Sequence, residues 1–163
     1  MQIKRWLILV VMLLCSGSLA VQAADLQDMQ GNPHALTEYT GKGKWLIVMF
    51  WAADCLICNK EAKHYERFHQ QHKDKDATLL GISMDGLDQR AQAQQFIREH
   101  KLTFPNLIGE AQQVASVYID NTGQNWVGTP TFLLFNPEGQ LKAEEAGAVP
   151  VKVIEAFIQA KPK

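Results

Sequence analysis

The sequence predicts an α/β fold in which helices cover both faces of a central mixed sheet. Two apolar runs of strand length, at residues 44–52 and 77–84, are each followed by a longer polar segment of helical periodicity. Such continuous apolar runs indicate strands that are buried on both faces. Near the end of the chain, residues 131–136 and 140–146 flank a Pro-Glu-Gly turn and predict an antiparallel hairpin. This order of elements favours a mixed sheet within a single layered domain.

The first 23 residues are set aside as a secretory signal peptide. Lys4 and Arg5 precede an apolar core at residues 6–14, and small residues lead up to Ala23, where cleavage is expected. An uncleaved membrane anchor is the alternative, but a spanning helix needs about 20 apolar residues and this core is much shorter. Lipid attachment at Cys15 is disfavoured because small residues do not precede it. Residues 24–163 then form one domain.

The remaining elements follow from local patterns along the chain. Turn residues at 28–33 between short apolar stretches predict a small N-terminal hairpin. A helix is expected over residues 56–72, where Ala62, Tyr65 and Phe68 recur at three-residue spacing. Further helices are expected at residues 88–101, with Asp88 as the N-cap, at residues 110–118, and at residues 151–158, where the pattern is amphipathic.

The composition and net charge give no indication of a nucleic-acid partner. Of the 163 residues, 47% are hydrophobic and 20% are charged, which is an ordinary globular balance. The formal net charge is −1. A surface for nucleic acid or another polyanion is therefore not expected.

Cys55 and Cys58 are the only cysteines that remain once the signal peptide is removed. Export would place them where disulfides persist, yet a disulfide across so short a loop stabilises a fold little. Cys55 falls at the start of a helix, whose free amides and dipole favour a thiolate and lower the thiol pKa. Cys58 returns to the same face one turn later. The pair is therefore predicted to act as nucleophile and resolving thiol in a reversible dithiol–disulfide cycle.

The residues around this motif resemble those of the thioredoxin superfamily, and within it the exported TlpA/ResA-like proteins. The sequence Phe50-Trp51-Ala52 precedes the motif, Gly128-Thr129-Pro130-Thr131 lies far downstream, and Leu102-Thr103-Phe104-Pro105 follows a predicted helix. The resemblance covers nearly all of the mature chain. It implies a thioredoxin-like fold with an N-terminal β-hairpin extension, and a periplasmic thiol–disulfide oxidoreductase of the protein-disulfide reductase type.

Glu61 is the third catalytic residue that this resemblance implies. It occupies the position, three residues after the second cysteine, of an active-site glutamate in TlpA/ResA-like proteins. A carboxyl group shielded from water has a raised pKa and could carry the proton to or from Cys58. Ordinary thioredoxins place a buried aspartate where this chain has Met49. The alternative is that Glu61 is a solvated helix residue.

The same resemblance predicts a substrate-binding surface opposite the cysteines. Pro130 matches a proline that is cis in this fold, and the backbone of Thr129 beside it could pair with an extended substrate segment. Trp51, which ends the strand before the motif, is assigned to this surface as well. Trp126 follows a polar turn at residues 120–125 that looks inserted, and it could cover the active site or pack into the core.

Two departures from the family pattern affect the expected chemistry. Asp54 stands where a tryptophan usually precedes the first cysteine, and its charge disfavours the Cys55 thiolate. Leu56 and Ile57 offer no charge that stabilises it. These residues favour a reductant over a strong oxidase. Lys63 replaces a common proline, so the usual kink of this helix is not expected.

Copper(I) handling is the main rival function, because the two thiolates have ligand spacing and His64, His69 and His72 follow on the same helix. The histidines are instead expected on a wet helix surface. A zinc site would need more nearby ligands. A peroxiredoxin-type peroxidase would have a threonine shortly before its cysteine, where this chain has Ala52-Ala53-Asp54.

The sequence does not identify the substrate. We expect exported proteins with disulfides as substrates, a DsbD/CcdA-type membrane reductase as the recharging partner, a monomeric state, and no bound cofactor.

Overall fold

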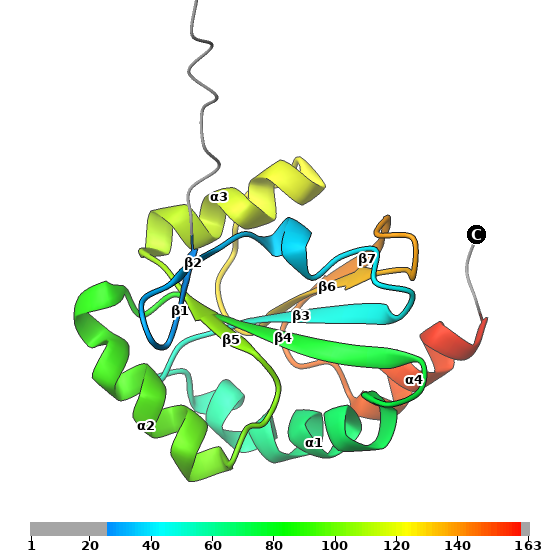
Figure 1. Cartoon of the computed structure of the whole chain (residues 1–163), viewed down its shortest axis with the longest axis horizontal. Helices are drawn as coiled ribbons and strands as arrows, with labels where there is room; N and C mark the ends of the chain where they lie inside the picture. Colours follow the sequence, from blue (N-terminus) through cyan, green and yellow to red (C-terminus); the bar gives the residue numbers. More distant parts are fainter. Residues whose placement is uncertain (1–25, 161–163) are drawn as a thin grey trace, which may run out of the picture.

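The computed structural model describes residues 26–160 (Figure 1), and the predicted signal peptide lies outside them. Within these residues one mixed sheet has the strand order β2-β1-β5-β4-β3-β6-β7. Its strands are Leu26–Asp28 (β1), Pro33–His34 (β2), Trp45–Trp51 (β3), Ala77–Ser83 (β4), Asn106–Ile108 (β5), Thr131–Phe135 (β6) and Leu141–Ala146 (β7). The helices are Leu56–His72 (α1), Arg90–His100 (α2), Ala111–Thr122 (α3) and Val151–Ala160 (α4), with 3-10 turns at Leu36–Glu38 (η1) and Leu87–Gln89 (η2).

The strand β3 lies at the centre of the sheet and leads into the redox motif. It runs parallel to β4 and antiparallel to β6, so that Met49 is paired with Gly81 on one side and with Phe132 on the other. All seven residues of β3 are buried. The predicted mixed sheet with helices on both faces and an N-terminal β-hairpin is confirmed, and the fold is thioredoxin-like.

Alternate residues of β3 enter two separate cores. Met49 and Trp51 join the core beneath α1, α2 and α4, whereas Val48 and Phe50 join the core beneath α3. Figure 1 shows these helices on opposite sides of the sheet. Successive side chains of a strand point to opposite faces, so this alternation decides which side chains lie near the cysteines.

Three elements differ from those predicted from the sequence. The strand β5 is absent from the prediction, because three residues are too few to show a period. Asp88 lies inside the 3-10 turn η2 and caps no helix, while the carboxylate of Glu110 accepts the Leu87 N–H. The helix α3 continues to Thr122, so the first half of the predicted polar turn at 120–125 is helical, and Gly123 ends the helix with a left-handed φ of 70°.

Among the described residues, none of the helices is both long enough and apolar enough to cross a membrane.

Candidate active site

Cys55 and Cys58 form a disulfide at the N-terminus of α1, directly after β3 and a short turn. Cys55 is the N-cap residue, and its Sγ accepts a hydrogen bond of 3.1 Å from the Cys58 backbone N–H. One of the free amides of the first helical turn therefore faces this sulfur, as the sequence predicted. The same amide would stabilise a Cys55 thiolate after reduction.

The two cysteines differ in their access to solvent. The Cys58 side chain is fully buried, whereas Cys55 is half-buried at the surface. Leu56 between them is 79% exposed, and the neighbouring Ile57 is also exposed. An incoming disulfide can therefore reach Cys55 and not Cys58. This asymmetry agrees with the predicted roles of nucleophile and resolving thiol.

Asp85 holds the turn that precedes Cys55, and sequence reasoning missed it. Both of its carboxylate oxygens accept the Ala53 N–H, at 2.9 and 3.1 Å. The buried hydroxyl of Ser83 donates to the same carboxylate at 2.6 Å. Asp85 follows β4, so the contact joins the ends of two neighbouring parallel strands. The available signal was a carboxylate directly after the predicted apolar run at residues 77–84.

Asn59 and His100 form a second contact to this turn that the sequence did not reveal. The Asn59 side-chain amide donates to the carbonyl oxygens of Ala53 and Cys55, at 2.9 and 3.0 Å. His100, the last residue of α2, lies with its Nε2 at 3.0 Å from Asn59 Oδ1. Burial lowers the pKa of His100, which favours its neutral form.

Glu61 is partly shielded, with 22% of its side chain exposed, and it contacts His64 at 3.0 Å. The two residues line a cavity of about 380 Å³ between α1 and the start of α4. Burial raises the pKa of nearby Tyr65 to about 12, and the charge of Glu61 adds to this shift. Met49 and Cys58 lie in the core on this same side of the sheet. Glu61 is thus neither fully solvated nor fully buried, and its proton-carrying role stays a prediction.

The Thr129–Pro130 peptide bond is cis, as predicted. The buried Pro130 precedes β6, and its carbonyl oxygen accepts the Gly147 N–H at 2.8 Å. Thr129 is half-buried. Its pairing with a substrate strand stays a prediction.

Trp51 lies in the core and not at the predicted substrate-binding surface. Its side chain is 1% exposed and stacks on Phe96 of α2, with ring centroids 4.3 Å apart. The indole N–H donates to Asn106 at 3.1 Å. A Cβ on Gly81 would lie 2.8 Å from that nitrogen, so glycine there leaves room for the bond. A side chain so enclosed supports the fold and cannot contact a substrate.

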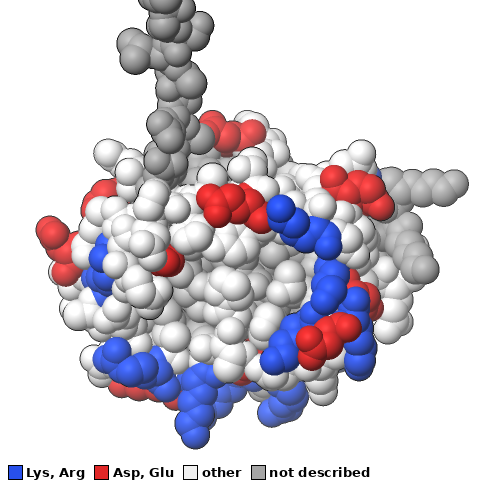
Figure 2. Space-filling view, viewed as in Figure 1, with Lys and Arg blue, Asp and Glu red and all other residues white. Residues whose placement is uncertain are grey.

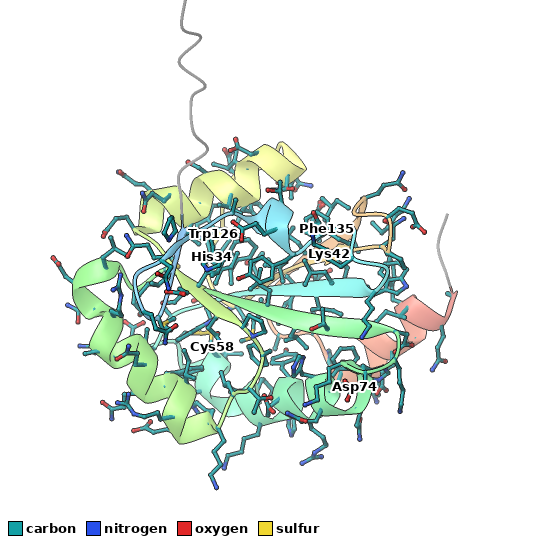
Figure 3. All side chains as sticks on the ribbon, in the orientation of Figure 1. His34, Lys42, Cys58, Asp74, Trp126 and Phe135 are labelled. Atoms are coloured by element: carbon teal, nitrogen blue, oxygen red, sulfur yellow. A yellow bond between two sulfur atoms is a disulfide. The ribbon has the colours of Figure 1, made fainter. Side chains whose placement is uncertain are left out.

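Trp126 packs as the second of its two predicted alternatives describes. Its ring meets Phe50 and Tyr118 edge to face, with centroids 5.1 and 5.3 Å apart. Both partners belong to the core beneath α3. Figure 3 shows Trp126 and Cys58 on opposite sides of the sheet. Since Trp126 faces away from the cysteines, the structure corrects the expectation that it covers the active site.

The three histidines of α1 are separately engaged. His64 contacts Glu61, and His72 contacts Asp76 at 2.8 Å. His69 is only 5% exposed, and its Nδ1 accepts the Leu79 N–H at 3.3 Å, so it is not on the wet surface that the sequence predicted. Within residues 26–160 no cluster of three or more metal-ligating side chains occurs.

The surface charge is mixed. On the face shown in Figure 2, basic and acidic side chains both lie around the rim, and the centre is largely uncharged. This mixed distribution agrees with the net charge of −1.

Residues 19–144 match the model of the AhpC/TSA family. The "Thiol-disulfide oxidoreductase ResA" of Halalkalibacterium halodurans is 25% identical over 134 residues, which cover 82% of this chain and 70% of that protein. The "Peroxiredoxin Bcp" of Bacillus subtilis is 27% identical over 128 residues, covering 74% of this chain and 78% of that protein.

A solved structure of the thioredoxin domain of the thiol–disulfide oxidoreductase BVU-2223 from Bacteroides vulgatus is also similar. It superposes with a TM-score of 0.66 at 28% identity, over 82% of this chain and 91% of that one.

Proposed function

This chain belongs to the AhpC/TSA family, and we propose that it is an exported enzyme that reduces disulfides in other exported proteins through Cys55 and Cys58. The ResA relatives confirm the predicted activity class, which is thiol–disulfide oxidoreductase. They also confirm the ResA-like resemblance predicted from the sequence. The observation that carries the proposal is the Cys55–Cys58 disulfide, which lies at a helix N-terminus with Cys58 fully buried and Cys55 partly exposed.

The exchange proceeds in two displacements. The Cys55 thiolate attacks one sulfur of a substrate disulfide, which forms a mixed disulfide and releases one substrate thiolate. Cys58 then loses its proton and attacks Cys55 Sγ, which forms the Cys55–Cys58 disulfide and releases the second thiolate. The substrate gains two electrons and the enzyme loses two. Glu61, one turn beyond Cys58 on α1, is proposed to accept the Cys58 proton.

The direction toward reduction is supported by the side chains around Cys55. Asp54 is exposed beside it, and its carboxylate disfavours a neighbouring thiolate. Leu56 and Ile57 are exposed and uncharged. A less stabilised thiolate makes the dithiol form of the enzyme less stable, so the enzyme gives up its electrons more readily. The exposed apolar side chains of Leu56 and Ile57 also suit contact with an unfolded or extended protein segment.

The proposed enzyme is exported and must be reduced again after each cycle. The solved structures that resemble this chain include one described as secreted, from Mycobacterium tuberculosis, and the sequence begins with the predicted signal peptide. We therefore place the enzyme in the periplasm, where it would act as a monomer without a bound cofactor. A DsbD/CcdA-type membrane reductase is the proposed source of electrons.

Trapping of mixed disulfides tests the proposal. A Cys58→Ser variant keeps the nucleophile but lacks the resolving thiol, so mixed disulfides with substrates should accumulate and be captured from the periplasm. Cys55→Ser is the matched control, since the motif thiol that it keeps, Cys58, is fully buried. Capture by Cys58→Ser alone supports the proposal. Equal capture by both variants, or capture by neither, would contradict it.

Peroxide reduction is the outcome to distinguish, because one relative is named a peroxiredoxin. The reduced enzyme should exchange with protein disulfides much faster than it consumes hydrogen peroxide. A faster reaction with peroxide would refute the reductase assignment.

A further inference from the structure

Asn59 links the two sides of the turn at residues 53–55, which connects β3 to the helix that carries the cysteines. Its side-chain nitrogen donates to the carbonyl oxygens of Ala53, before the motif, and of Cys55, within it. The Cys55 carbonyl already accepts the Asn59 backbone N–H at 3.0 Å as the first bond of the helix. The side chain is therefore not needed to start α1. Its additional effect is to tie Ala53 to the first turn of the helix.

The orientation of the Asn59 amide determines the tautomer of His100. Because the NH₂ group faces two carbonyl oxygens, Oδ1 must face His100 and can only accept. His100 Nε2 therefore carries the hydrogen. His100 Nδ1 is buried and has no hydrogen-bond partner among residues 26–160. A proton on that nitrogen would be buried without an acceptor, so the site favours the neutral ring.

The position of His100 is fixed by packing as well. Its ring lies against Phe96 one turn earlier in α2, with centroids 4.5 Å apart. Phe96 in turn stacks on Trp51 at the end of β3. Lys63 on α1 and Glu99 on α2 are the charged groups that act on His100, in opposite directions. The donor is thus held by a second helix and by the strand that leads to the cysteines.

We propose that Asn59, held by His100 of α2, is a positioning residue that keeps Cys55 Sγ aligned with the Cys58 amide. This inference rests on the proposed exchange at Cys55. On the opposite side, Asp85 fixes the N–H of Ala53, whose carbonyl Asn59 holds. The contact between Asn59 and Ala53 lies at the wall of a cavity of about 220 Å³ between α1 and α2, which both residues line. A helix far from the motif in sequence thereby sets the thiolate's surroundings.

Two substitutions test this role, Asn59→Leu and His100→Phe. Each keeps the bulk of the side chain and removes the hydrogen bonds. In the reduced protein the pKa of Cys55, measured by thiolate absorbance, should rise by about 0.4 to 1 unit, the range that one lost hydrogen bond produces. The equilibrium with glutathione should shift by about two- to tenfold toward the Cys55–Cys58 disulfide. His100→Gln, which can still donate to Asn59, should restore most of both values.

His69→Phe is the control for a purely structural effect. His69 is also buried and bonded to backbone, but on the part of α1 away from the cysteines. It should lower stability and leave the Cys55 pKa and the glutathione equilibrium unchanged. The inference is overturned if Asn59→Leu and His100→Phe lower stability but keep wild-type values of both redox readouts. It is also overturned if His69→Phe shifts them equally.

The result separates this inference from the proposed function. The Cys55 pKa and the glutathione equilibrium need no protein substrate, so failure to trap a substrate would leave them unaffected. Unchanged redox readouts in a protein that still forms mixed disulfides would refute the positioning role alone.

Discussion

Replacing Asp85 with alanine should lower the free energy of unfolding of the oxidised protein by about 2–4 kcal/mol. The carboxylate accepts the Ala53 N–H at 2.9 Å and the Ser83 hydroxyl at 2.6 Å. Hydrogen bonds to a charged group contribute about 1.5–3 kcal/mol each, and the partial exposure of Asp85 favours the lower part of that range. Ser83 is fully buried, so its hydroxyl cannot turn to solvent once the acceptor is gone.

Urea unfolding of the oxidised protein measures this change, with the slope of the transition checked for constancy. Asp85→Asn keeps a neutral acceptor and should cost about 1 kcal/mol, because neutral hydrogen bonds are weaker by roughly half. Asp88→Ala, at an exposed carboxylate in the adjoining 3-10 turn, is the matched control and should change stability by less than about 0.5 kcal/mol. If Asp85→Ala is no more destabilising than Asp88→Ala, the assigned contacts do not hold the turn.

Glu61→Gln should slow the release of substrate from the mixed disulfide by at least about tenfold near neutral pH, while the first attack by Cys55 keeps its rate; stopped-flow kinetics separates the two steps, and equal slowing of both would argue against a proton carrier for Cys58. Burial lowers the pKa of His69 below its ordinary value of 6.5, so the unfolded chain binds this proton more tightly than the folded protein does. The stability that neutral His69 contributes should therefore be fully present above about pH 6.5 and should decline as the pH falls below that value. The hydrogen bond to Glu38 raises the pKa of His34, so the contribution of His34 to stability has the opposite pH dependence. The measurement is therefore the difference in free energy of unfolding between wild type and His69→Phe, from urea unfolding at several pH values. A difference that does not change with pH would contradict the predicted pH dependence of His69.

The spacing of apolar residues along the chain was sufficient to predict the strand and the helix that position the cysteines. The apolar run of β3 and the three-residue spacing of Ala62, Tyr65 and Phe68 predicted a strand followed by a helix, and α1 spans the predicted residues 56–72. Cys55 was expected at the start of that helix and is its N-cap. These features depend on neighbours within a few positions of one another. The sequence therefore contains them directly.

The strand β3 also shows where such reasoning stops. All of its residues are apolar and buried, so no polar alternation indicates which face each side chain takes. Trp51 was expected near substrate and instead stacks on Phe96 in the core. Trp126 had two open interpretations, and its contacts with Phe50 and Tyr118 decide between them. Aromatic side chains fit either a surface or a core, and only the packing distinguishes the two.

The sequence by itself determined the redox pair, its place at a helix N-terminus and the order of the main elements, whereas the cis bond at Pro130 was predicted only through the resemblance to thioredoxin-like proteins. Only the tertiary structure decided what surrounds the pair. Asp85 comes from the end of a neighbouring strand, and His100 from the end of a second helix. Contacts between elements distant along the chain have no fixed spacing, since sheet order and helix packing bring them together. The Cys55–Cys58 motif is therefore local in sequence, whereas the hydrogen bonds that hold its turn depend on the whole fold.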